Sequence, residues 1–145
     1  MKKPEDVKLQ IAELLKNVKG VDVENLFRFS SALNELHTVT EDDENLKGYV
    51  FGLLEGDHPG IRSGKWTVVV SDKKLHFLQK SLISSLHHFE LPLGSVASMK
   101  GKLGWLFGKI EIRFEGGNLQ IIQIGKKDFQ FFLDTTGDLV LKEKG

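Results

Sequence analysis

From Gly48 onward the sequence has the pattern of short β-strands separated by turn residues, and this pattern constrains the fold more than any other feature. In the clearest strand, Ile110 and Ile112 alternate with charged residues, so one face belongs to a hydrophobic core and the other to water. The alternation shifts phase between Ile121 and Ile122, which predicts a β-bulge or burial of both faces. Seven strands are predicted, at about residues 48–55, 65–71, 74–80, 85–91, 95–100, 109–115 and 119–125.

The segments on either side of these strands have a helical period. Residues 4–19 carry one apolar stripe, and a second helix is expected to begin at Asp22, which would cap it. Two helices this short cannot bury their stripes alone, so they must pack on each other, on the strands or on another subunit. After the strands, Phe129 and Phe132 lie on one stripe of a closing helix that Gly137 ends. The tail beyond it is expected to extend this helix or to fray.

Seven antiparallel strands followed by one amphipathic helix is the element order of the pleckstrin-homology-like (PH-like) barrel. The run KWTVVVSDKKLHFLQKSL resembles the strand–turn–strand signature of bacterial PH-like domains, particularly the YokE-like group. The runs FELPLGSVASMKGKLGWLFGKIEIRF and GKKDFQFFL resemble the Gly-rich hairpin and closing helix of that group. The resemblance covers about residues 47–136 and implies a mostly β fold with α: a seven-stranded antiparallel barrel, capped by a C-terminal helix and preceded by two N-terminal helices. We expect an N-terminal helical extension over residues 1–46 and the PH-like domain over residues 47–145.

Composition narrows the chemistry that the chain can support. The 145 residues include no cysteine, which excludes disulfides, thiolate metal sites and cysteine nucleophiles, and which fits a cytoplasmic protein. Twenty basic and twenty acidic side chains cancel, so no overall charge attracts nucleic acid, and no nucleic-acid partner is expected. The N-terminus is polar, and no window approaches the ~18 consecutive apolar residues of a membrane span. A soluble protein is therefore expected.

Motifs of catalysis are missing from the sequence. No Gly-x-Ser-x-Gly motif is present, and Gly101, Gly104 and Gly108 precede a strand instead of the helix that a phosphate loop requires. The acidic run 41–44 lacks the spacing of a calcium loop, so a solvated linker or helix start is expected. The resemblance to PH-like domains likewise implies a binding scaffold. We expect no enzyme activity, no catalytic residues and no cofactor.

The histidines of the predicted strands are the only obvious metal ligands. A tight hairpin between the third and fourth strands would place His76 opposite Phe89 and His87 opposite Leu78. His87 and His88 are adjacent in sequence, so they point to opposite faces of their strand and cannot bind one metal ion together. The sequence therefore predicts no metal site.

The candidate binding element is the Gly-rich segment 101–109, in which a Trp-Leu-Phe run is flanked by glycines and lysines. Three interpretations are open: the aromatic residues fill the barrel, they contact a protein, or they enter a membrane interface while the lysines meet anionic head groups. We favour a protein partner or self-association, with an anionic membrane surface as the alternative. Phosphoinositide recognition is not expected, because the first hairpin offers only Arg62 and Lys65 as basic residues. The candidate binding residues are Lys100, Lys102, Trp105, Leu106, Phe107 and Lys109, with Lys73 and Lys74 of a neighbouring hairpin extending the basic surface.

Overall fold

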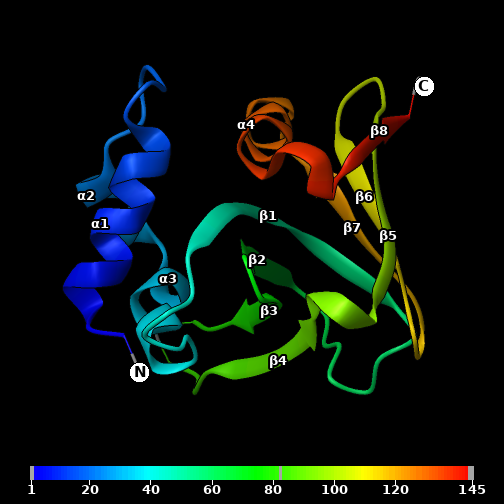
Figure 1. Ribbon diagram of the computed structural model, residues 1–145, viewed down its shortest axis with the longest axis horizontal. Helices are drawn as coiled ribbons and strands as arrows, with labels where there is room; N and C mark the ends of the chain where they lie inside the picture. The colour runs from blue at the N-terminus through cyan, green and yellow to red at the C-terminus, as the bar shows by residue number, and fades with distance from the viewer. Residues whose placement is uncertain (1, 82, 144–145) are drawn as a thin grey trace.

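The computed structural model describes residues 2–81 and 83–143, and it contains one eight-stranded sheet with helices at two of its sides (Figure 1). The helices are α1 (Pro4–Leu15), α2 (Val23–Phe29), α3 (Ser31–Glu35) and α4 (Lys126–Thr136), and the 3-10 turns are η1 (Leu36–Thr38), η2 (Leu93–Ser95) and η3 (Gly137–Leu139). The strands are β1 (Leu46–Gly56), β2 (Lys65–Ser71), β3 (Lys74–Gln79), β4 (His87–Pro92), β5 (Val96–Leu103), β6 (Gly108–Phe114), β7 (Gly117–Ile124) and β8 (Leu141–Glu143). No helix in the described part of the chain is long and apolar enough to cross a membrane.

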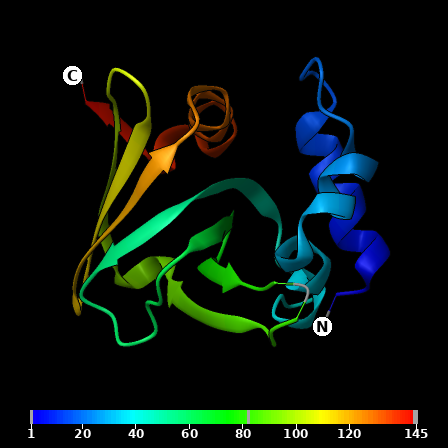
Figure 2. The ribbon, with the colours of Figure 1, turned by 180° about the vertical axis from the view of Figure 1, so that it is seen from behind.

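The strand order of the sheet is β4-β3-β2-β1-β7-β6-β5-β8. The long strand β1 joins the two halves, because residues 46–53 pair with β2 and residues 53–56 pair with β7. Figure 2 shows the strongly bent sheet from behind, with β1 crossing between the halves. The predicted set of seven antiparallel strands is confirmed, as is the closing helix, which Gly137 ends with a φ of 58°.

The C-terminal segment adds an eighth strand that the sequence pattern does not predict. Residues 141–143 pair in parallel with residues 100–102 of β5, so this part of the tail neither extends α4 nor frays. Residues 144 and 145, also part of the predicted tail, lie outside the described residues.

The predicted irregularity in the last antiparallel strand is a β-bulge. Gly108 pairs with Ile124 and Ile110 pairs with Ile121, so the interval of β7 holds one residue more than that of β6. The extra residue is accommodated at Gln123, whose φ of 56° lies in the left-handed region. The bulge bends the sheet beside the start of α4.

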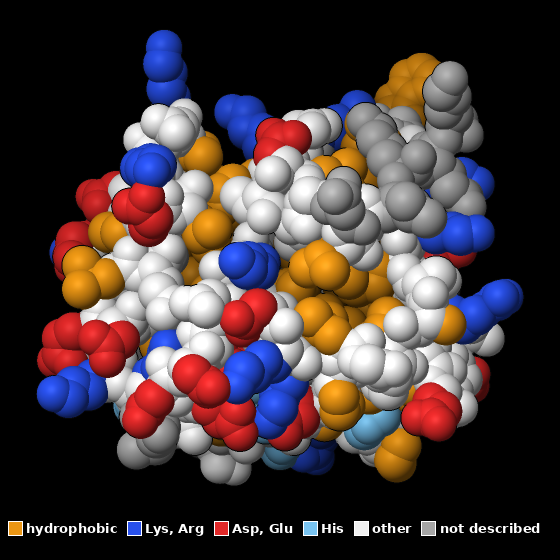
Figure 3. All heavy atoms as spheres, in the orientation of Figure 1, with side chains coloured by type: hydrophobic (Ala, Val, Ile, Leu, Met, Phe, Trp, Pro, Cys, Tyr) orange, Lys and Arg blue, Asp and Glu red, His pale blue; other side chains and the backbone are white. Residues whose placement is uncertain are grey.

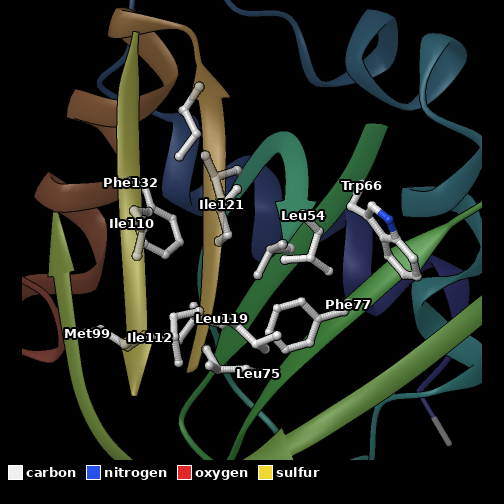
Figure 4. Packing of buried hydrophobic residues seen from close by; sticks show 14 of the residues in the cluster. Leu54, Trp66, Leu75, Phe77, Met99, Ile110, Ile112, Leu119, Ile121 and Phe132 are labelled. Carbon is white, nitrogen blue, oxygen red and sulfur yellow. The ribbon is translucent and has the colours of Figure 1, made fainter. Parts of the chain in front are cut away.

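The inner face of the bent sheet holds the main hydrophobic core. Figure 4 shows side chains from both halves pointing toward one another, with Trp66 and Phe77 on one side and Ile110 on the other. Phe129 and Phe132 of α4 complete this core, and both are buried. Trp66 is 1% exposed and belongs to this core.

The N-terminal helices cover the outer face of β1–β3, on the left in Figure 1. Ile11 of α1 is fully buried in a second core that includes Val69 and Leu78, two residues that point away from the first core. Both faces of β2 are therefore buried, which explains its nearly continuous apolar sequence. The sequence allowed the helices to pack on one another, on the strands or on another subunit. In the structure they pack on one another and on the strands.

The second predicted helix is in fact two helices, and the first is shorter than predicted. Asp22 caps α2 as expected, by accepting a hydrogen bond from the backbone N–H of Glu24. The chain then breaks at Ser30, which has an extended backbone (φ −122°, ψ 98°) and whose hydroxyl accepts from the N–H of Leu33 to cap α3. The first helix ends at Leu15 instead of continuing to residue 19.

Candidate functional site

The tip of the β5–β6 hairpin carries the largest consecutive run of exposed apolar side chains among the described residues. Trp105 is 89% exposed, Leu106 68% and Phe107 48%. The turn is closed by the N–H of Gly104, which donates a 2.9 Å hydrogen bond to the carbonyl of Phe107. Figure 3 shows the tip as a hydrophobic projection at the upper right. The interpretation that these aromatic residues fill the barrel is therefore wrong.

The base of the hairpin is packed against α4, which explains why the tip projects. A Cβ atom at Gly101 would lie 3.1 Å from Cδ2 of Leu133 and 3.1 Å from Cζ of Phe129, so the backbone of β5 nearly touches the helix. Because α4 already occupies the open end of the bent sheet, the residues of the turn have no interior volume to fill.

The lysines near this tip differ in exposure and in ion pairing. Lys102 is exposed, and Lys109 forms an ion pair with Glu111 at 3.1 Å. Lys100, on the same strand as Lys102, is also exposed to solvent. Two further exposed lysines, Lys126 and Lys127, begin α4 two residues after Ile124, the pairing partner of Gly108. These two were not among the predicted site residues, because only the β6–β7 register shows that they lie at the hairpin end of the sheet.

The other two predicted site residues lie elsewhere. Lys73 lies in the β2–β3 turn and pairs with Asp43 of the loop before β1, and Lys74 begins β3 and pairs with Glu90 of β4 at 3.1 Å. Figure 1 shows this loop (cyan) at the bottom of the molecule, whereas the β5–β6 hairpin reaches its top. The hydrogen bond with Glu90 raises the pKa of Lys74 above its ordinary value. The structure therefore does not bring Lys73 and Lys74 together with the hairpin.

A second polar cluster lies on the outer face of β3 and β4, and the predicted register there is wrong. His76 lies opposite Glu90 instead of Phe89, and Leu78 lies opposite His88 instead of His87. The chain between β3 and β4 is longer than a tight hairpin, which shifts the pairing by one residue and exchanges the two faces of β4. The shift brings His76, His88 and Glu90 onto one face, with donor atoms within 4.8 Å of one another.

Glu44, from the predicted solvated linker, is fully buried over this cluster. Its carboxylate accepts hydrogen bonds from the N–H of Glu41 (2.9 Å), the hydroxyl of Ser71 (2.7 Å) and Nε2 of His76 (2.8 Å). Burial alone would raise the pKa of Glu44, but these hydrogen bonds outweigh it, and the net pKa is lowered. The linker prediction is wrong for this residue, and no feature of the acidic run distinguishes Glu44 from its exposed neighbours.

The cluster contains a serine, a histidine and a glutamate, but it lacks the geometry of a nucleophilic triad. The hydroxyl of Ser71 donates to Glu44, whereas a nucleophile would donate to the imidazole that acts as its base. Ser71, His76 and Glu44 are also all fully buried, so no substrate reaches the hydroxyl. Burial and the neighbouring His76 lower the pKa of His88, which favours its neutral form.

A groove lies between α2–α3 and the outer face of β1–β3. Leu26, Phe51 and Lys80 line it, and Phe29, which is 83% exposed, lies at its rim.

Comparison with known proteins places this geometry in context. Residues 40–137 match the family model of the bacterial PH domain. Among solved structures, the hSac2 domain from human phosphoinositide phosphatase Sac2 is similar with a TM-score of 0.50 and 11% identity, over 85% of this chain and 89% of that chain. The N-terminally truncated linker-DH/PH domains of p115-RhoGEF give a TM-score of 0.44 and 14% identity, over 94% of this chain and 41% of that chain. No curated protein matches the sequence. At 11% identity, the likeness to the hSac2 domain concerns the fold alone.

Proposed function

Since its family model covers residues 40–137, the chain belongs to the bacterial PH domain family, and we propose that it is a non-catalytic module that binds a protein partner through the β5–β6 hairpin. One observation carries the proposal: Trp105, Leu106 and Phe107 project into solvent from a hairpin whose base is packed on α4. Because the base is held in place, the tip loses little conformational entropy when it enters a pocket of a partner. We also propose that the chain belongs to the YokE-like group, on the sequence resemblance described above.

The aromatic side chains and the charge around the hairpin tip favour a protein partner over a membrane surface. Trp is enriched among the residues that dominate protein interfaces, where it fills pockets and excludes water. An anionic bilayer would need a strong positive collar in addition to the apolar tip, and Glu111 partly neutralises this collar by pairing with Lys109. Self-association is the simplest form of this proposal, with a second copy supplying the pocket.

Membrane binding is the second candidate, and a separate observation supports it. Lys102, Lys126 and Lys127 are exposed at the same end of the sheet as the aromatic tip. Aromatic rings at the lipid boundary with lysines at the level of the head groups are the arrangement of a peripheral membrane contact. Such binding would weaken steeply with salt, whereas an apolar protein contact would not.

Site-specific crosslinking tests the protein proposal. A photoreactive amino acid replaces Leu106 at the tip, and the matched control replaces Leu9 on α1, which is also a leucine and also 68% exposed. We expect position 106, but not position 9, to yield a discrete protein adduct in living cells or a crosslinked dimer of the purified chain. Trp105→Ala should abolish the adduct. Identical adducts from both positions, or none from position 106, would contradict the proposal.

Vesicle titration tests the membrane candidate on the same residue. Trp66 and Trp105 are the two tryptophans of the chain. Because Trp66 is buried, added lipid is expected to change the fluorescence of Trp105 alone. A salt-sensitive blue shift with anionic but not neutral vesicles, absent in Trp105→Phe, would favour the membrane over the protein partner. If neither the shift nor co-sedimentation occurs, the membrane candidate is rejected while the crosslinking test stands.

A further inference from the structure

Three potential metal ligands converge on the outer face of β3 and β4, far in the chain from the hairpin tip. Nδ1 of His76 lies 3.2 Å from Nε2 of His88 and 3.5 Å from Oε2 of Glu90. The register explains this convergence, because Glu90 is the direct cross-strand partner of His76 and His88 is the next residue along the same face. The three side chains therefore reach one point from two rigid, paired strands.

Two of the three separations between these donor atoms are close to those of a tetrahedral coordination shell. Zinc binds imidazole nitrogen and carboxylate oxygen at about 2.0–2.2 Å, which places two tetrahedral ligands about 3.3–3.5 Å from each other. The two measured separations fall close to this range. A cation between the ligands would also remove a repulsion. A nitrogen lone pair of His76 and the carboxylate of Glu90 are both acceptors, and they repel unless a cation or proton lies between them.

The side chains around the ligands hold them in the orientation that binding requires. The carboxylate of Glu44 is already an acceptor for Glu41 and Ser71, so Nε2 of His76 must donate to it, and in the neutral imidazole the lone pair is then on Nδ1. A buried carboxylate behind a ligating histidine is a recurrent outer-shell partner of zinc. Lys74 donates to Oε1 of Glu90 and so leaves Oε2 for the ion.

We infer that His76, His88 and Glu90 form a binding site for a divalent transition-metal ion of the zinc class, with Glu44 as the positioning residue behind His76. His88 is half-buried and the side chain of Glu90 is 37% exposed, so the ion enters from this side. Three protein ligands leave the fourth position for water or for a group of a bound partner. A bound ion joins β3 to the edge strand β4, and through Glu44 it also stabilises the segment that leads into β1.

Metal titration of the full chain tests this inference directly. The protein is stripped with a chelator and titrated with zinc chloride by calorimetry, and cobalt(II) is used as a spectroscopic probe of ligand geometry. We expect one ion per chain, a rise in Tm on zinc addition and the intense visible bands of tetrahedral cobalt. Because the chain has no cysteine, these bands cannot arise from thiolate ligands.

Matched variants of β4 distinguish the site from unspecific binding. His88→Ala should lose saturable binding, and Glu90→Gln should weaken it at least about tenfold. His87→Ala is the control, because this neighbouring histidine points to the opposite face of the same strand and contacts Arg62. Circular dichroism verifies that each variant is folded; His76 is left intact because it is fully buried.

Two results would overturn the inference. If the two imidazoles merely share a hydrogen bond, the wild-type chain binds no ion at one-to-one stoichiometry. If ions bind elsewhere, His88→Ala and Glu90→Gln retain wild-type affinity, or His87→Ala loses as much as they do. Should His88→Ala fail to fold, the comparison of Glu90→Gln with His87→Ala, together with the cobalt spectrum, still decides the outcome.

Discussion

Gly108 of β6 lies directly against the ring of Phe129 on α4, where a Cβ atom at position 108 would stand 2.4 Å from Cδ2 of the ring. Real Cβ atoms essentially never approach another heavy atom this closely. The ring is fully buried in the main core and cannot move aside without displacing α4. This contact fixes how the hairpin leaves the core and therefore where its aromatic tip points.

Gly108→Ala is expected to destabilise the protein by ~1–3 kcal/mol, since the added methyl group overpacks the core. Urea denaturation followed by the fluorescence of Trp66 measures the change in the free energy of unfolding. Gly94→Ala is the control, because no atom lies within 4 Å of a Cβ atom at that position. Equal urea midpoints for the two variants would show that the contact between Gly108 and Phe129 is not tight.

Tyr49 should titrate far above the ordinary range of a phenol. The residue is buried between Phe51 and Phe131, and this burial, with a smaller contribution from the charge of Asp128, raises its pKa to about 12. A folded-state pKa above the unfolded value of about 10 means that the protonated phenol stabilises the fold. This stabilisation is complete below pH 10 and is lost as the pH rises from about 10 to about 12.

The chain has a single tyrosine, so tyrosinate absorbance reports on Tyr49 alone. We expect the absorbance to rise only near pH 12 or together with unfolding, and Tyr49→Phe to show a smaller loss of stability in alkali. A tyrosinate signal with a midpoint near 10, in a protein that circular dichroism shows to be folded, would refute the prediction.

Local patterns were enough to predict the main elements of the fold. Alternation marks β6, and the phase shift at Ile121 marks the bulge, because both follow from which side chains face the core. The break at Ser30 was missed because an amphipathic stripe runs through it, and only the backbone geometry shows the serine capping a new helix. The strand β8 was missed because three residues are too few to show a period.

The candidate sites depend on contacts that the sequence does not encode locally. The hairpin could be singled out from its composition. The exposure of Trp105, however, follows from the fact that side chains of α4 occupy the core. The histidine cluster depends on the β3–β4 register, which the connection between Gln79 and His87 sets without a recognisable turn motif. The burial of Glu44 depends on contacts with Ser71 and His76, which lie 27 and 32 residues away in the sequence.

Ile11 tests whether the predicted N-terminal extension and the PH-like domain fold as one unit. Its side chain is fully buried against the outer face of β1–β3, so Ile11→Ala should cost ~2–5 kcal/mol of unfolding free energy. Leu9→Ala is the matched control on the same helix, and because Leu9 is 68% exposed we expect a change within about 0.5 kcal/mol.

The two parts of the chain can be followed separately in urea. Far-ultraviolet circular dichroism reports mainly on the helices, three of which belong to the extension, whereas Trp66 reports on the main core. We expect the two transitions to coincide in Ile11→Ala as in the wild type, because loss of the helices uncovers Val69 and Leu78 on strands that also form that core. An earlier loss of the helical signal, with Trp66 still buried, would instead make residues 1–46 an independently unfolding extension.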